Sequence, residues 1–289
     1  MFKDNALASK SVLITGGGSG LGLAMARGFA ALGAQVAICG RTEEKLLKAA
    51  GKIDAASSAG KKTLTHVSDV RDYEAVGKMM DALEAETGGL NVLVNNAAGN
   101  FLSASEDISP NAFKSVIDIV LHGTFNCTQH FGKRAIEAKR PASILNIVTT
   151  YTETGSAFVM PSACAKAGVY AMTNSLAYEW ATYNIRVNRI APGPFPTEGA
   201  WSRLMPDPKM EEMYKNQIPA GRYGEHEELA NLASFLISDA SAYLTGECIT
   251  IDGGERLKAG QFNFIAQAAP REQIKQFFSM MKASAKKKG

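Results

Sequence analysis

Short apolar segments alternate with longer amphipathic segments along most of the chain, and this alternation constrains the fold more than any other feature. The apolar segments are rich in β-branched residues and stay apolar at consecutive positions, which indicates strands buried on both faces. Seven of them are candidate strands: Ser11–Thr15, Gln35–Cys39, Thr63–Val67, Asn91–Asn95, Ser143–Val148, Arg186–Ile190 and Cys248–Ile251. Buried strands of this kind pair in parallel when helices connect them.

The segments between these strands are long enough for connecting helices. The clearest candidates are Leu21–Leu32, Tyr73–Glu86, Asn111–Arg134 and Ala163–Tyr183. Alternating strands and helices predict an α/β fold with a doubly wound, parallel seven-stranded sheet of Rossmann type. No internal repeat or Pro/Gly/Ser-rich linker divides the sequence, so we expect residues 1–289 to form a single domain.

Two segments depart from this alternation. The segment 194–225 contains several prolines and glycines and is too long for a simple connection between a strand and a helix. Such a segment indicates a lid or a binding loop. Residues 255–289 form a C-terminal extension with a helix expected from about Pro270. That helix places four apolar residues on one face, which are Ile274, Phe277, Phe278 and Met281.

The apolar stripe of the extension admits two interpretations. It can pack on the domain or on a neighbouring subunit, as most such stripes do. Alternatively, Lys286, Lys287 and Lys288 could support binding of the helix to a membrane surface.

Composition limits the classes of function. A chain of 289 residues with 46% hydrophobic residues can bury a large core without disulfides or metals. The net charge of +3, with no basic stripe before the C-terminus, does not favour nucleic acid as a partner. Neither the four cysteines nor the four histidines have metal-ligand spacing, so we expect free thiols, structural histidines and no metal.

Targeting signals are not evident in the sequence. Only about ten residues precede the first strand, which leaves no room for a leader peptide. No run reaches the roughly 18 apolar residues of a membrane span. The final residues do not form a peroxisomal tripeptide. We therefore expect a cytoplasmic protein with no membrane span.

A glycine-rich turn directly follows the first strand. Gly16, Gly20 and Gly22 lie in the segment TGGGSGLG, which has the spacing T-G-x-x-x-G-x-G. Glycines allow the sharp turn and the close approach of backbone to a pyrophosphate, and the helix that follows offers unpaired N–H groups. The more familiar G-x-G-x-x-G spacing is absent, because Leu21 occupies the place of its third glycine.

The end of the second strand favours NADP(H) over NAD(H). An NAD enzyme normally places a carboxylate there to bind the ribose hydroxyls. This chain has Gly40 followed by Arg41, so no carboxylate would repel a 2′-phosphate and a guanidinium could bind it.

Four motifs in order resemble the signature of the short-chain dehydrogenase/reductase family: TGGGSGLG, SDV at 68–70, NNAAG at 95–99 and PGP at 192–194. The resemblance implies that Asp69 contacts the adenine, that Asn95 and Ala97 shape the nicotinamide side, and that residues 192–195 close over the nicotinamide ribose. The full set of implied cofactor-binding residues is Gly16, Gly18, Ser19, Gly20, Leu21, Gly22, Arg41, Asp69, Val70, Asn95, Ala97, Lys166, Pro192, Gly193, Pro194 and Phe195.

The catalytic motif departs from the common pattern of that family. Most members carry Tyr-x-x-x-Lys, whereas this chain has Lys166 with Ser162 in place of the tyrosine, and Thr149 in place of the usual upstream serine. A serine hydroxyl is too weakly acidic to replace the phenol. A plain carbonyl reductase is therefore in doubt, but Tyr151 lies just past the fifth strand, at the edge where such enzymes bind ligands.

This segment resembles the 2,4-dienoyl-CoA reductase branch, which also uses Ser-x-x-x-Lys with a displaced tyrosine. The resemblance implies that Tyr151 and Asn100 bind the thioester oxygen, and that Tyr151 delivers or relays a proton to the α carbon. Lys166 would hold the nicotinamide ribose and, through its charge, favour proton release from Tyr151. Ser162 would support Lys166 and the cofactor.

Further segments extend the same resemblance, among them NNAAGNF, ISPNAF, GAWSRL and GQFN. The implied contacts with the acyl-CoA substrate are Arg71, Phe101, Ser109 and Arg203. A homo-oligomer, a tetramer in this family, is implied as well. Two alternatives stay open: a reductase of the same family that acts on another acyl thioester or ketone, and a cofactor-binding protein without catalysis.

Overall fold

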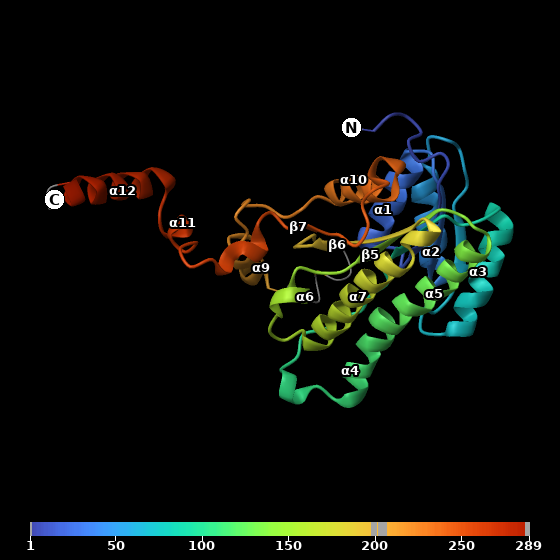
Figure 1. Ribbon diagram of the computed structural model, residues 1–289. Helices are drawn as coiled ribbons and strands as arrows, with labels where there is room; N and C mark the ends of the chain where they lie inside the picture. Colours follow the sequence, from blue (N-terminus) through green and yellow to red (C-terminus); the bar gives the residue numbers. More distant parts are fainter. Residues whose placement is uncertain (1, 198–200, 202–206, 287–289) are drawn as a thin grey trace.

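A computed structural model describes residues 2–197, 201 and 207–286 (Figure 1). Seven parallel strands form one sheet in the order β3-β2-β1-β4-β5-β6-β7. Their bounds are β1 Ser11–Thr15, β2 Gln35–Gly40, β3 Leu64–Val67, β4 Val92–Asn95, β5 Ala142–Ile147, β6 Ile185–Pro192 and β7 Cys248–Ile251. The predicted fold class is confirmed, and each predicted strand is present within about two residues of its expected ends.

Helices cover both faces of the sheet. On one face lie α1 (Gly20–Ala31), α2 (Glu43–Asp54) and α10 (His226–Ile237), and on the other lie α3 (Tyr73–Thr87), α5 (Gly123–Glu137) and α7 (Met160–Glu179) (Figure 1). Within the described residues, the other α-helices are α4 (Pro110–Ile117), α6 (Tyr151–Thr154), α9 (Pro208–Lys215), α11 (Ile265–Ala268) and α12 (Arg271–Lys286). The 3₁₀ turns are η1 (Ser105–Asp107), η3 (Ala181–Tyr183), η4 (Asp239–Ser241) and η5 (Glu255–Ala259).

Alternate side chains of each central strand enter two separate cores. In β1, Val12 and Ile14 join the apolar cluster beneath α1 and α10, whereas Leu13 joins the cluster beneath α3 and α5. All three side chains are fully buried. This two-sided burial explains why the strands read as continuous apolar runs rather than as alternating patterns.

The strand order changes direction between β1 and β4. The chain builds outward from β1 to β3, returns to place β4 beside β1, and then builds outward to β7. The carboxyl ends of β1 and β4 therefore diverge into loops on opposite faces of the sheet, and ligands of open α/β sheets bind in the crevice that results.

One predicted helix contains an irregularity. The segment expected as a single helix over Asn111–Arg134 runs from α4 into α5 through a π-helical turn, η2 (Asp118–His122). The Thr124 hydroxyl donates to the Val120 carbonyl oxygen at 2.6 Å beside this turn. A π turn inserts one extra residue without changing which residues are apolar, so the sequence pattern does not reveal it.

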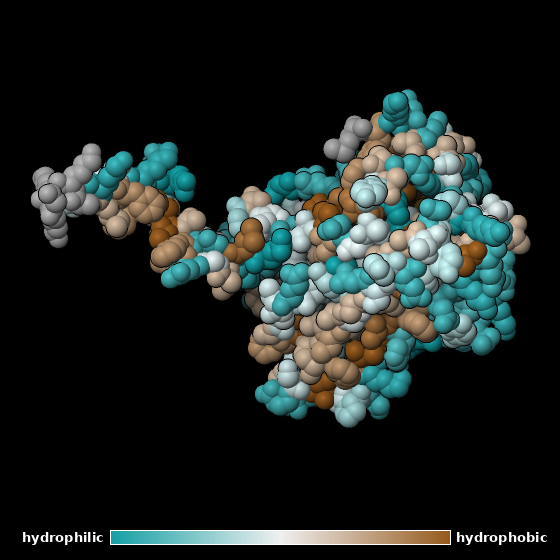
Figure 2. Space-filling view, in the orientation of Figure 1, coloured by the Kyte–Doolittle hydropathy of each residue, from teal (hydrophilic) through white to brown (hydrophobic). Residues whose placement is uncertain are grey.

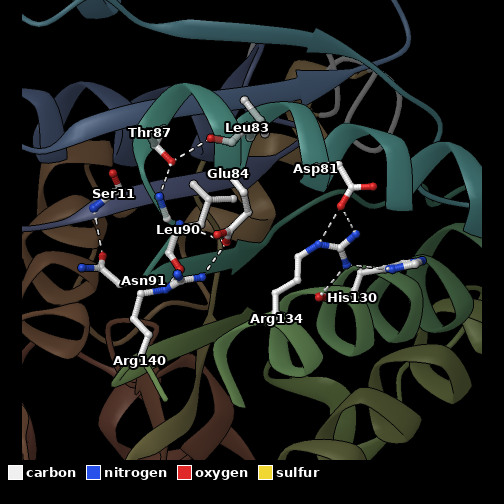
Figure 3. A network of polar contacts seen from close by, with 11 residues as sticks. Ser11, Asp81, Leu83, Glu84, Thr87, Leu90, Asn91, His130, Arg134 and Arg140 are labelled. Carbon is white, nitrogen blue, oxygen red and sulfur yellow. Dashed lines mark hydrogen bonds and ion pairs between the residues drawn. The ribbon is translucent and has the colours of Figure 1, made fainter. Parts of the chain in front are cut away.

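An ion-pair network fixes the amino end of β4, opposite the crevice (Figure 3). Arg140 donates from Nε to the Leu90 carbonyl at 2.8 Å and from Nη2 to Glu84 at 2.6 Å. Arg134, on α5, pairs with Asp81 of α3. The network ties α3 and α5 to the start of β4, so the other end of the strand can carry functional residues on a rigid support.

The C-terminal residues extend away from the sheet. After η5, α11 and α12 form an arm that projects from the rest of the molecule (Figure 1). The expected helix is thus confirmed from Arg271. None of the helices in the described part of the chain combines the length and apolar character needed to cross a bilayer.

Candidate active site

The glycine-rich turn has the backbone that its sequence predicts. Gly16 and Gly20 adopt positive φ angles of 65° and 53°, which favour glycine. A Cβ atom at Gly22 would lie 2.6 Å from the Gly16 carbonyl oxygen. The first turn of α1 that follows contains no acidic residue. This turn and helix start form a close-fitting backbone cradle that suits an anionic group.

Two side chains that the sequence argument did not single out hold this cradle to the end of β4. The Thr15 hydroxyl accepts hydrogen bonds from the backbone N–H groups of Asn96 at 3.0 Å and Ala97 at 2.9 Å. The Asn96 amide in turn donates to the carbonyl oxygens of Thr15 at 3.0 Å and Gly16 at 3.3 Å. The loops after β1 and β4 therefore form one hydrogen-bonded unit.

Arg41 lies exposed directly after β2, and its positive charge acts on the carboxylate of Asp69. Arg71 donates to both carboxylate oxygens of Asp69 from Nε at 3.0 Å. This hydrogen bond, aided by the charges of Arg71 and Arg41, holds the pKa of Asp69 below its usual value. Two of the predicted residues, one for cofactor and one for substrate, thus form an ion pair.

Asn95 is buried below the crevice and belongs to a polar network. Its amide donates to Thr128 at 2.9 Å and to Asn146 at 2.8 Å, and the Asn146 amide donates to Thr173 at 2.8 Å. The network joins β4 and β5 to helices α5 and α7. Through it, Asn95 would shape the site by fixing the strand ends.

The segment after β6 turns back over β7. The Gly193 N–H donates to the Ile251 carbonyl at 2.9 Å, and a Cβ atom at Gly193 would lie 2.6 Å from Asp252. Phe195 is buried against Gly224, so its ring helps to fix the segment. Pro192 ends β6 at the carboxyl edge of the sheet, as expected for a segment that borders the crevice.

Helix α7 presents Ser162 and Lys166 on the same face. The helix begins at Met160 with Pro161 in its first turn, a position that proline favours. Ser162 and Lys166 are four residues apart and both are buried. The Lys166 ammonium donates to the Ile147 carbonyl at the end of β5. Burial lowers the pKa of Lys166 to about 8.

Tyr151 lies where the sequence places it, and its hydroxyl is the centre of the cluster. Helix α6 carries Tyr151 directly after β5. Its Oη lies 3.0 Å from Ser162 Oγ and accepts a 3.5 Å contact from the Asn100 amide. The side-chain oxygen of Asn100, Oδ1, accepts the backbone N–H of Phe101 at 2.9 Å. This bond orients the side-chain nitrogen of Asn100 toward the phenol. Three predicted catalytic residues thus converge on one oxygen.

A second set of contacts, not anticipated from the sequence, supports the turn that carries Tyr151. The Tyr170 hydroxyl donates to Glu153 on α6 at 3.3 Å. The guanidinium of Arg189 lies 3.4 Å from the centre of the Tyr170 ring, and Arg189 also donates to Asn174 at 2.7 Å. Arg189 is buried, so the contact links the turn to the core.

Thr149, at the position of the family's upstream serine, acts on the backbone. Its hydroxyl oxygen accepts the N–H of Tyr151 at 3.1 Å. The Thr149 carbonyl oxygen accepts the Thr152 hydroxyl at 3.0 Å. Thr149 therefore stabilises the start of α6, and Tyr151 stands at the centre of the site instead.

Three aromatic residues gather in the predicted lid. The Trp201 ring lies 5.0 Å from that of Tyr223 and 6.1 Å from that of Tyr214, measured between centroids. Burial, with the Glu255 carboxylate as a smaller cause, raises the pKa of Tyr214. The cluster provides an apolar wall. Spacing alone did not predict it, because the three residues come from separate parts of an irregular segment.

The predicted substrate residues differ in what the structure shows of them. Phe101 packs on the small apolar cluster that includes Val148 and Val169. The Ser109 hydroxyl oxygen caps α4 by accepting the Ala112 N–H at 3.2 Å. Arg203 lies outside the described residues.

The histidines are expected to be structural, and two of them contact backbone carbonyl groups. His130 contacts the Tyr73 carbonyl at 3.0 Å, and His226 contacts that of Pro196 at 2.7 Å. The four cysteines are free thiols. Among the described residues, no group of three or more His, Cys, Asp or Glu side chains could hold a metal ion.

The family model described as enoyl-(acyl carrier protein) reductase matches residues 16–255. This match covers every strand of the sheet except β1, which ends at Thr15. The protein is therefore an oxidoreductase, and the chain belongs to the short-chain dehydrogenase/reductase family. Within that family it resembles the 2,4-dienoyl-CoA reductases.

Two relatives illustrate this resemblance. A Caenorhabditis elegans protein described as probable 2,4-dienoyl-CoA reductase 3, (3E)-enoyl-CoA-producing, is 44% identical over 89% of this chain and 83% of its own length. A Bacillus subtilis protein described as probable 2,4-dienoyl-CoA reductase, (2E)-enoyl-CoA-producing, is 42% identical over 89% of this chain and all of its own.

Solved structures support the assignment to the family. A short chain dehydrogenase from Bacillus anthracis is 44% identical, with a TM-score of 0.78 over 86% of this chain and 97% of its own. A gluconate 5-dehydrogenase from Burkholderia cenocepacia, in complex with NADP and tartrate, is 32% identical, with a TM-score of 0.80 over 87% of this chain and 97% of its own.

Proposed function

We propose that the protein reduces 2,4-dienoyl-CoA thioesters with NADPH, a step in the oxidation of unsaturated fatty acids. The observation that carries this proposal is that Asn100 and Ser162 both contact the Tyr151 hydroxyl, with the buried Lys166 one turn after Ser162 on α7. The usual tyrosine position holds Ser162, so the acid stands on a different element from that of a ketone reductase.

The Tyr151 hydroxyl and the Asn100 amide would bind the thioester carbonyl oxygen. Reduction of the diene at its far end moves negative charge onto this oxygen. Two donors held close together can both reach such an oxygen, and one such donor commonly contributes about 10²–10³ in rate. The 3.5 Å contact between Asn100 and Tyr151 leaves both groups free to turn toward a substrate oxygen.

Tyr151 would then supply a proton to the substrate carbon. Protonation at the α carbon leaves a double bond between C3 and C4, which corresponds to the (3E) product named for the C. elegans relative. Ser162, 3.0 Å from the phenol, is placed to relay a replacement proton. Identifying the product isomer by chromatography against standards tests this assignment.

The cradle fits NADP(H) by its backbone and its charges. The positive φ of Gly16 and the missing Cβ of Gly22 leave room for a pyrophosphate at the start of α1. Arg41 is exposed where a 2′-phosphate would lie, and Lys166 would hold the nicotinamide ribose. When bound, NADPH supplies the hydride.

The charges at the mouth of the crevice suit a CoA ester. Arg71 is half exposed while it pairs with Asp69, so its guanidinium can also contact a phosphate. The aromatic wall of Trp201, Tyr214 and Tyr223 suits an acyl chain. The resemblance further suggests a homotetramer, which sedimentation would test. A cytoplasmic location is a separate part of the proposal, and cell fractionation would test it.

The test compares three substrates under identical conditions. The purified protein is mixed with NADPH and a 2,4-dienoyl-CoA, a 3-oxoacyl-CoA, or the free dienoic acid, and cofactor and diene absorbance are followed. We expect the dienoyl-CoA to react far faster than the other two. Arg203→Ala should narrow the gap between the CoA ester and the free acid, mainly by raising KM.

Other outcomes would identify other functions. Faster turnover of the 3-oxoacyl-CoA would identify a reductase of another acyl thioester, with Tyr151 still the acid. Binding of NADPH without turnover of any substrate would indicate a cofactor-binding protein. Equal rates with the CoA ester and the free acid would exclude the CoA-binding role of the arginines.

A further inference from the structure

Residues 260–286, which we call the C-terminal arm, make few contacts with their own sheet and helices. The arm comprises α11 and α12 and projects from the body (Figure 1). Among the described residues, the hydrogen bonds of 265–286 join residues of the arm to one another. The family match ends at residue 255, so the arm follows the part of the chain that the family model matches.

The arm exposes an apolar surface. Ile274 is buried at the start of the stripe, but Phe277 and Phe278 are 53% and 47% exposed. Further exposed apolar side chains on the arm are Phe262, Phe264, Met280 and Met281. Figure 2 shows tan and brown residues along the arm beside hydrophilic ones. Most of the stability of a helix in a protein comes from packing of its amphipathic face, so a surface that covers this stripe would stabilise α12.

The size of the stripe matches a protein interface. Aromatic side chains bury about 150–250 Å² each, so four half-exposed phenylalanines and two methionines offer roughly 500–600 Å². Two arms exchanged about a two-fold axis would supply roughly 1,000–1,200 Å² from arm side chains alone, which approaches the range of specific interfaces.

Charge favours another copy of the same chain as the partner. Residues 271–289 contain six Lys or Arg residues and one Glu, within a chain of net charge +3, so residues 1–270 carry a net charge of −2. The body of a second copy therefore attracts the arm. An anionic membrane surface would attract the arm but repel the body. Phe262 and Phe264 are exposed apolar residues that lie before α12. A helix that binds a membrane surface through its own apolar face does not require them.

We infer that the arm packs its apolar face, centred on Phe277 and Phe278, on the body of a second copy of this chain. In a symmetric pair each copy gives and receives one arm. This inference concerns assembly and does not depend on the proposed reaction.

The test compares two double variants of the full-length protein. Phe277→Ser with Phe278→Ser removes the apolar face, whereas Gln273→Ser with Gln276→Ser changes α12 elsewhere and is the control. Sedimentation over a dilution series measures the mass of the particle. We expect multiples of 30.8 kDa for the wild type and the control. The phenylalanine variant should dissociate at a concentration at least about tenfold higher.

Cross-linking identifies which copy the arm touches. Light and isotopically heavy protein are mixed, allowed to exchange and treated with a lysine-specific reagent. Mixed light–heavy links from Lys275 or Lys282 to lysines of the body would support the inference. A monomeric wild type, links within single copies only, or equal dissociation of both variants would overturn it. So would an arm that is protected from proteolysis only when phosphatidylserine vesicles are added.

Discussion

The burial of Lys166 predicts an unusual pH dependence of stability. Its pKa falls from 10.5 to about 8 because burial disfavours the charged form. Below pH 8 the lysine is protonated in both the folded and the unfolded chain, so folding carries the full cost of burying the charge. Between pH 8 and 10.5 only the unfolded chain keeps the proton, so stability rises with pH in this window.

The size of the effect follows from the shift. One pKa unit corresponds to about 1.4 kcal/mol, so the whole window represents roughly 3 kcal/mol and the step from pH 8 to 9.5 about 2 kcal/mol. The free energy of unfolding in urea would be measured without cofactor for the wild type and for Lys166→Met, at one protein concentration. The wild type should gain about 2 kcal/mol relative to the variant over that step.

Other groups titrate in the same range, and the comparison between proteins removes their contribution. Lys48→Met, at an exposed position of α2, provides a matched control that removes a lysine from solvent. If the wild type and Lys166→Met show parallel pH profiles, Lys166 is charged in the folded protein and the burial argument fails.

Three further predictions concern the site itself. Tyr151→Phe should fold and bind NADPH yet lose activity by roughly 10²–10⁴, while Ser162→Ala loses distinctly less; the reverse ranking would reassign the acid. Arg41→Ala should raise KM for NADPH much more than KM for NADH, and a wild type that prefers NADH would remove the phosphate-binding argument. Tyr170→Phe, which removes the hydrogen bond to Glu153, should lower kcat by about 2–10-fold with KM for NADPH unchanged; an unchanged kcat would show that this bond does not position the acid.

Periodicity predicted the sheet and the helices well because burial on both faces leaves a strong pattern in the sequence. The predicted bounds of Ser11–Thr15 and Cys248–Ile251 agree with β1 and β7. The start of α7 was predicted at Ala163 but lies at Met160, because Pro161 is accommodated in the first turn. The π turn at 118–122 left no signal, since it depends on backbone geometry alone.

The cluster of Asn100, Tyr151 and Ser162 could be predicted from motifs, because these residues lie in recognisable segments after β4 and β5. The contacts that support it could not. Tyr170, Arg189 and Glu153 come from three elements, and the packing of α7 on both β6 and α6 brings them together. The pairing of Arg71 with Asp69 also depends on the turn after β3.

The hydrogen bonds between Thr15 and the loop after β4 have a consequence for protein engineering. They join the glycine-rich turn, where the proposed cofactor would place its pyrophosphate, to the loop after β4, which would border its nicotinamide, whereas Arg41 stands on the separate loop after β2. Residues around Arg41 can therefore be redesigned toward NADH without moving the reacting end of the site. A change at Thr15 would shift both ends of the dinucleotide together, so cofactor preference and reaction geometry could no longer be adjusted separately.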